Sequence, residues 1–163
     1  MIPGIKKILY ATDLKEEECR ADFRMAVKLA MCNDAKLVVL HVMEPISSVM
    51  EGMLRNSMSD DELQQFKDDG IANLKQTLQK RIEDFCDKEC PNDDHSYPGG
   101  EPEILVRQGI ADEVILDQAK AHEADVIVMG TRTHTGIGQL LLGSVANKVI
   151  HHSKIPVVVY PLQ

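Results

Sequence analysis

The sequence predicts a doubly wound α/β fold, a five-stranded parallel sheet with helices on both faces. Strand-like and helix-like segments alternate five times along the 163 residues, and this alternation is typical of parallel sheets joined by right-handed crossovers. The run KLVVLHVM at residues 36–43 is almost continuously apolar, as expected of a strand covered on both faces. The length fits a single domain over residues 1–163.

The expected elements follow from the spacing of apolar residues. Strands are predicted at residues 5–11, 36–43, 103–107, 125–130 and 156–160. Helices are predicted at residues 16–32, about 60–90, a segment after Gly109, and Ser144 to about Ser153. Residues 46–59, which scatter Met50, Met53 and Met58, are expected to form a loop or an irregular lid, and residues 131–138 a loop.

Composition excludes several classes of function. The formal charge of −8 argues against binding the phosphate backbone of nucleic acids. Aromatic residues make up only 4% of the chain, which leaves few platforms for stacking bases. No apolar run reaches the length of a membrane span, and the N-terminal residues lack a signal-peptide profile. We therefore expect a cytoplasmic protein that binds neither nucleic acid nor membrane.

Two cysteines raise the question of a metal or redox site. Cys86 and Cys90 stand four residues apart in a predicted helix, so they can meet on one face as a disulfide or half a metal site. The paired spacing of zinc-binding cysteines is missing, and reduced thiols are the simpler interpretation in a reducing compartment. No nucleophile stands beside a base and no carboxylate pair lies near a substrate feature. We expect no catalytic site and no metal held by the protein.

The strongest chemical signal lies between Gly130 and Ser144. Gly130 ends an apolar strand, and Gly143-Ser144 opens a helix whose first N–H groups lack intrahelical partners. Such a helix start attracts phosphate, to which the Ser144 hydroxyl and the Arg132 guanidinium can add donors. The alternative is that Ser144 caps its own helix. The segment lacks the lysine of a P-loop and the third glycine of a dinucleotide fingerprint.

Three runs in the C-terminal half carry a family resemblance: Met129-Gly130-Thr131-Arg132, Leu141 to Val145, and Ile155 to Val159. Together with Ile8 to Asp13 and Leu40-His41-Val42 they resemble the universal stress protein family, over essentially the whole chain. The resemblance implies a Rossmann-like fold of the adenine nucleotide alpha hydrolase-like group. It also implies a stress-response protein that binds ATP or AMP.

The glycine pattern of that family is matched with one departure. In that family two glycines are separated by any two residues. Nine further residues then lead to a third glycine, which a serine or threonine follows directly. Gly130, Gly143 and Ser144 fit, but Thr133 replaces the second glycine. If that position needs a positive φ, a β-branched residue is strained there. A nucleotide-free dimeric interaction module of the same fold is therefore the alternative function.

The resemblance also implies roles for single residues. Asp13 contacts adenine or ribose, and Val42 flanks the base. The remaining implied pocket residues are Ala11, Thr12, Met129, Gly130, Arg132, Thr133, Gly143, Ser144 and Val145. Ala11 stands where the family usually has proline. From the residues alone, Asp13 can equally cap the first helix, while Val42 and Met129 suit a core.

Further implications concern ions, assembly and catalysis. Mg²⁺ is expected to bridge the phosphates if ATP binds, and any hydrolysis is expected to be slow. Pro156 to Tyr160 is an apolar edge strand, and exposed edges invite pairing; the resemblance implies a homodimer through this strand. A third hypothesis, a ligase or sulfurtransferase of the wider adenine-nucleotide group, needs a glycine-serine phosphate loop that Leu14-Lys15-Glu16 does not supply.

Overall fold

The computed structural model describes residues 4–14, 21–89, 97, 99–132, 134–136 and 139–162. Its main sheet has the strand order β3-β2-β1-β4-β7, and all four pairings are parallel. The strands are β1 (Lys7–Thr12), β2 (Lys36–Met43), β3 (Glu103–Gln108), β4 (Val126–Arg132) and β7 (Val157–Leu162). The chain therefore winds outward from β1 in both directions, which confirms the predicted doubly wound fold.

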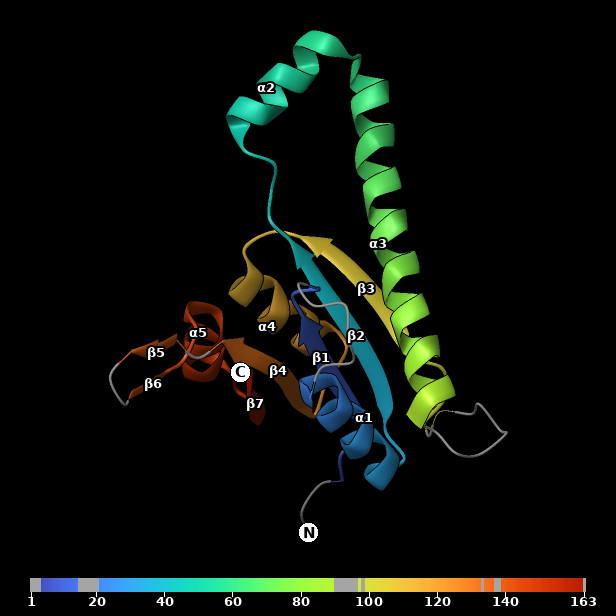
Figure 1. Ribbon diagram of the computed structural model, residues 1–163, viewed down its shortest axis with the longest axis vertical. Helices are drawn as coiled ribbons and strands as arrows, with labels where there is room; N and C mark the ends of the chain where they lie inside the picture. The colour runs from blue at the N-terminus through green and yellow to red at the C-terminus, as the bar shows by residue number, and fades with distance from the viewer. Residues whose placement is uncertain are drawn as a thin grey trace.

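Helices cover both faces of this sheet (Figure 1). α1 (Ala21–Asn33) and α3 (Asp60–Glu89) pack on one face, and α4 (Ala111–Ala121) and α5 (Ser144–His152) on the other. Side chains of β1 alternate between the two layers, so Ile8 and Tyr10 join the first core and Leu9 and Ala11 the second. The site described below lies on the α4–α5 face.

The predicted boundaries of β2 and the starts of β3 and α3 agree with the structure, and the other strand ends shift by one or two residues. The predicted first helix is described from Ala21 onward. Cys90 and the side chain of Cys86 lie outside the described residues, so their pairing stays untested. No helix within the described ranges is long and apolar enough to cross a membrane.

Two loop predictions are wrong. Residues 46–59 contain α2 (Ser48–Ser57), because the Ser47 side chain caps the helix by accepting a hydrogen bond from the Met50 amide at 3.2 Å. Residues 131–138 are not simply a loop, because β4 continues to Arg132 alongside β7. After β4, β5 (His134–Gly136) and β6 (Gln139–Leu141) pair antiparallel as a separate two-stranded sheet.

We call residues 48–69, which are α2 and the first turns of α3, the arm. Figure 1 shows the arm projecting beyond the strand ends of the main sheet. A capping box starts α3: the Ser59 amide donates to Glu62 Oε2 at 2.7 Å, and the Glu62 amide donates to Ser59 Oγ at 3.3 Å. Glu51 accepts hydrogen bonds from Lys67 and Arg55, each at 3.2 Å. These bonds lower the pKa of both glutamates.

One ion pair links neighbouring strands and gives the fold a pH-dependent contribution. Lys36 Nζ on β2 donates to Glu103 Oε2 on β3 at 3.1 Å, and this bond lowers the pKa of Glu103. A carboxylate with a lowered folded-state pKa stabilises the fold above its unfolded pKa, near 4.5. That contribution is lost as the pH falls through the folded pKa.

We predict that Glu103→Gln lowers the free energy of unfolding at pH 7, measured by urea denaturation. The loss should be less than about 1 kcal/mol because the ion pair is partly exposed. The difference from the unmodified protein should shrink as the pH falls below about 4.5. Glu101→Gln, at an exposed neighbouring position, is the matched control and should leave the midpoint unchanged. A Glu103→Gln effect of equal size at pH 3 and pH 7 would contradict this assignment.

Candidate functional site

The site is a notch created by the short central strand. β1 ends at Thr12, whose register partner on β2 is His41, and Ala11 is level with Met129 on β4. Both neighbours continue past this point, β2 to Met43 and β4 to Arg132. The winding direction reverses between β1 and β4, and ligands of doubly wound sheets bind at such a reversal, at the carboxyl ends of the strands.

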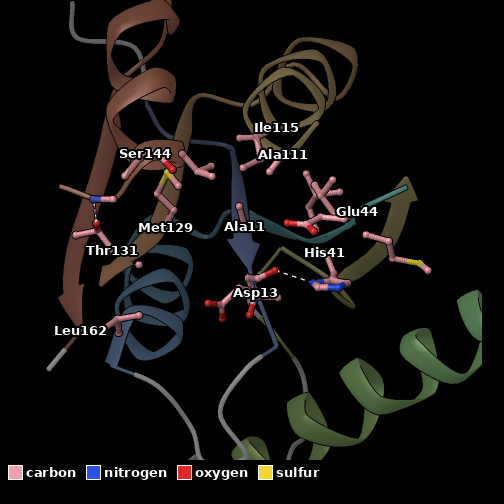
Figure 2. Close-up of a pocket in the computed structure, with 18 residues that line it drawn as sticks. Ala11, Asp13, His41, Glu44, Ala111, Ile115, Met129, Thr131, Ser144 and Leu162 are labelled. Atoms are coloured by element: carbon pink, nitrogen blue, oxygen red, sulfur yellow. Dashed lines mark hydrogen bonds between the residues drawn. The ribbon is translucent and has the colours of Figure 1, made fainter. Parts of the chain in front are cut away.

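A cavity of about 560 Å³ occupies the notch, within the range of small-molecule sites. Figure 2 shows its lining side chains coming from strand ends and from two helices on the same face of the sheet. The apolar part of the lining consists of Ala11, Leu40, Val42, Met43, Ala111, Ile115, Met129, Val145, Ala146 and Leu162. The polar part consists of Thr12, Asp13, His41, Glu44, Thr131 and Ser144, with Gly130 and Gly143.

The start of α5 supplies hydrogen-bond donors to the cavity. Gly143 is the N-cap residue, and its own amide donates to Thr131 Oγ1 at 2.8 Å. Its carbonyl accepts the first helical bond, from the Asn147 amide at 2.9 Å. None of the described residues accepts a hydrogen bond from the amides of Ser144, Val145 or Ala146, and all three residues line the cavity. This is the arrangement that binds anions at a helix start.

Gly143 allows the helix to sit this close to β4. A Cβ atom at position 143 would lie 3.2 Å from Thr131 Oγ1, which is tight contact. The cap position belongs to Gly143, and no side chain caps it, so the interpretation that Ser144 caps its own helix is wrong. Ser144 is instead the first residue of α5 and lines the cavity.

The other side of the notch is built from the end of β1. His41 Nδ1 donates to the Thr12 carbonyl oxygen at 2.9 Å, as Figure 2 shows. The Leu14 amide donates to Thr12 Oγ1 at 3.3 Å, and Leu14 has φ +58°, an unfavourable conformation for a branched residue. Asp13, between these two residues, is exposed and lines the cavity.

The backbone of Val42 also faces the notch. The carbonyl of Met43 accepts a hydrogen bond from the Gly109 amide at 3.0 Å, so Met43 points its backbone groups toward β3. Successive residues of a strand point these groups to opposite sides. The carbonyl of Val42 therefore points toward β1, beyond the residue where β1 ends. A ligand in the cavity can bond to it.

The described lining contains two carboxylates, Asp13 and Glu44, and no lysine or arginine. A phosphate group there would thus depend on the amides of α5. Within the described residues, no group of three or more histidine, cysteine, aspartate or glutamate side chains could hold a metal ion.

The structure brings nine of the eleven predicted site residues to this cavity: Ala11, Thr12, Asp13, Val42, Met129, Gly130, Gly143, Ser144 and Val145. Arg132 is described only through its backbone, which pairs with Leu162, and Thr133 lies outside the described residues. Lining residues outside the predicted eleven include Thr131, the acceptor beside Gly143, and Ala111 and Ile115 of α4. Gly109 at the end of β3 correctly predicted a helix after it, and that helix starts at the same edge of the sheet.

The fold and this cavity define the class: a doubly wound α/β protein with a cavity at its switch point, lined by the start of a helix. The chain belongs to the universal stress protein family, whose model matches residues 4–161. It is 30% identical to universal stress protein A homolog 2 of Coxiella burnetii, over 93% of this chain and 92% of that protein.

Solved structures agree in fold. Universal stress protein UspA from Lactobacillus plantarum has a TM-score of 0.66 at 23% identity, covering 97% of this chain and 99% of that one. A universal stress protein in complex with cAMP has a TM-score of 0.59 at 17% identity, covering 99% of this chain and 100% of that one. Both likenesses show the fold of this chain.

Proposed function

We propose that this chain, as one domain over residues 1–163, binds ATP or AMP in the notch and acts in the stress response as a cytoplasmic regulatory dimer. The observation that carries the proposal is the set of three amides at the start of α5 that face the cavity without an acceptor among the described residues. The complex of a family member with cAMP gives independent support for an adenine nucleotide.

The base would lie over the end of β1. Ala11, Leu40 and Met129 form an apolar surface there, suited to a flat ring. The Val42 carbonyl faces this space and would accept a hydrogen bond from the 6-amino group of adenine. Guanine carries a carbonyl at the equivalent position, which would leave two acceptors facing each other.

The sugar and phosphates would extend from β1 toward α5. The Asp13 carboxylate at the mouth of the cavity would accept hydrogen bonds from ribose hydroxyls. The phosphates would bind the α5 amides and the Ser144 hydroxyl, with Gly130 and Gly143 allowing close approach. Arg132 and Thr133 stay in the proposed set of nucleotide-binding residues. The residues fit Mg²⁺ only as an ion carried by ATP, held through phosphates and at most a lining carboxylate.

We expect at most slow ATP hydrolysis. Among the described lining residues, His41 commits its Nδ1 to the Thr12 carbonyl, and the carboxylates of Asp13 and Glu44 belong to exposed residues at the rim. None of these groups stands beside an arrangement that would orient an attacking water. The nucleotide would then serve as a signal or a stabiliser. The nucleotide-free module remains the second candidate because Thr133 replaces a motif glycine.

The dimer would form through β7, an edge strand of the sheet. The Ile127 amide donates to the Pro156 carbonyl at 3.0 Å, so by alternation along the strand the backbone groups of Val157 and Val159 point to the free edge. Pro161 falls on the same edge, where its missing N–H costs no bond to β4. A second β7 can therefore pair along Val157 to Val159.

The central test is Gly143→Asp against Gly143→Asn. Both side chains occupy the cap position and can accept from the α5 amides, but only aspartate adds negative charge. We expect ATP affinity to fall on the order of 100-fold in Gly143→Asp and about tenfold in Gly143→Asn, measured by calorimetry. Adenosine, which lacks phosphates, should bind both variants normally. Unchanged ATP binding by Gly143→Asp would refute the phosphate position.

A second test concerns the base. Because the Val42 carbonyl is an acceptor, ATP should bind at least about tenfold more tightly than GTP. The two nucleotides differ in the base alone, so displacement of a fluorescent ATP analogue by each gives a matched comparison. Equal displacement would show that the base does not reach Val42.

The dimer is tested with Val159→Pro and Val159→Thr. Proline removes the edge N–H without removing a bond to β4, whereas threonine keeps the N–H and the β-branched shape. We expect Val159→Pro to sediment as a monomer and Val159→Thr as a dimer. A dimeric Val159→Pro would mean that another surface holds the two copies together.

A further inference from the structure

The outer side of α2 is apolar and exposed. Val49, Met50 and Met53 have 67%, 50% and 61% of their surface accessible. At about 100° per residue these three side chains share one side of the helix. Leu54 in the last part of the helix and its C-cap residue Met58 are only half-exposed, and α2 contacts α3.

This face is held in place by the remainder of the arm. Glu51 bridges Arg55 of its own helix and Lys67 of α3, and Arg55 also pairs with Asp60 at the start of α3. Leu63 in the first turn of α3 is buried, with 2% of its surface exposed. α2 is thus a positioned helix with one side packed and the other side unpartnered among the described residues.

The charge around the face is net negative. Residues 48–69 contain six acidic and two basic residues, and both basic residues, Arg55 and Lys67, are already paired with carboxylates. Phe66 on α3 is 55% exposed, and Glu62 and Asp69 lie within one helical turn of it. The arm therefore presents apolar side chains beside uncompensated negative charge.

We propose that the outer face of α2, formed by Val49, Met50 and Met53, docks a cationic amphipathic helix of a partner protein. The apolar stripe of such a helix would cover the two methionines, whose flexible side chains adapt to different partners, and its basic flanks would meet the acidic residues of the arm. A second copy of this chain is disfavoured because it brings the same negative charge to the contact. An anionic membrane surface is disfavoured for the same reason.

The test uses a fluorescein-labelled leucine–lysine peptide of about 14 residues with its leucines on one helical face. Binding to the full chain is followed by fluorescence anisotropy. An isomer of identical composition, with leucines spread around the helix, controls for charge alone. We expect the amphipathic peptide to bind at least about tenfold more tightly than the isomer, and less tightly as salt rises.

Substitutions locate the contact. The double variant Met50→Gln, Met53→Gln keeps side-chain length and helix propensity, and both positions are exposed, so its circular dichroism should be unchanged. Peptide affinity should fall about tenfold. Met31→Gln, at a methionine 51% exposed on α1, is the matched control and should bind normally. Asp69→Asn should weaken binding several-fold, whereas Asp117→Asn on α4 should not.

Three outcomes would overturn the proposal. The first is equal binding of the two peptides, or no binding of either. The second is an equal effect of Met31→Gln and the double variant. The third is a double variant that binds peptide normally but changes its oligomeric state or its affinity for ATP, because α2 would then cover a second copy or the notch. The peptide assay needs no nucleotide, so it is independent of the proposed function.

Discussion

The early end of β1 is the constraint on which the site depends. A central strand that stops before its two neighbours leaves backbone groups of those neighbours without a strand to pair with, and buried backbone groups need a partner. In this chain β1 ends at Thr12, and Leu14 follows with φ +58°. The crossover connections bring the starts of α4 and α5 to the same edge. Cavity, donors and apolar surface all follow from that one termination.

The hydrogen bond between Thr131 and Gly143 fixes the position of the donors. Thr131 is 4% exposed, so its hydroxyl is held within the protein, and the Gly143 amide donates to it at 2.8 Å. This bond couples the end of β4 to the first residue before α5. The Gly143 amide is used in this bond, whereas the amides of Ser144, Val145 and Ala146 belong to residues that line the cavity. A ligand would therefore meet donors already in place, which reduces the ordering cost of binding.

Much of this arrangement could be predicted from the sequence, because it depends on local patterns. The almost continuously apolar run of β2 and the helical spacing of apolar residues in α3 predicted these elements without tertiary information. The spacing of Gly130, Gly143 and Ser144 located one wall of the cavity. α2 was missed because its stability comes partly from α3, through the contact between Glu51 and Lys67. Thr131 and Ala111 were not among the predicted site residues, because their place in the lining follows from how distant elements meet.

The strand order also shapes how the chain is made. β1 can pair with β2 as soon as residue 43 has left the ribosome, but its other edge receives β4 only after residues 126–132 have been synthesised. During that interval one edge of β1 has no paired strand, and chaperones or other chains can bind to it. The central place of its first strand makes this a protein that completes its core late in translation.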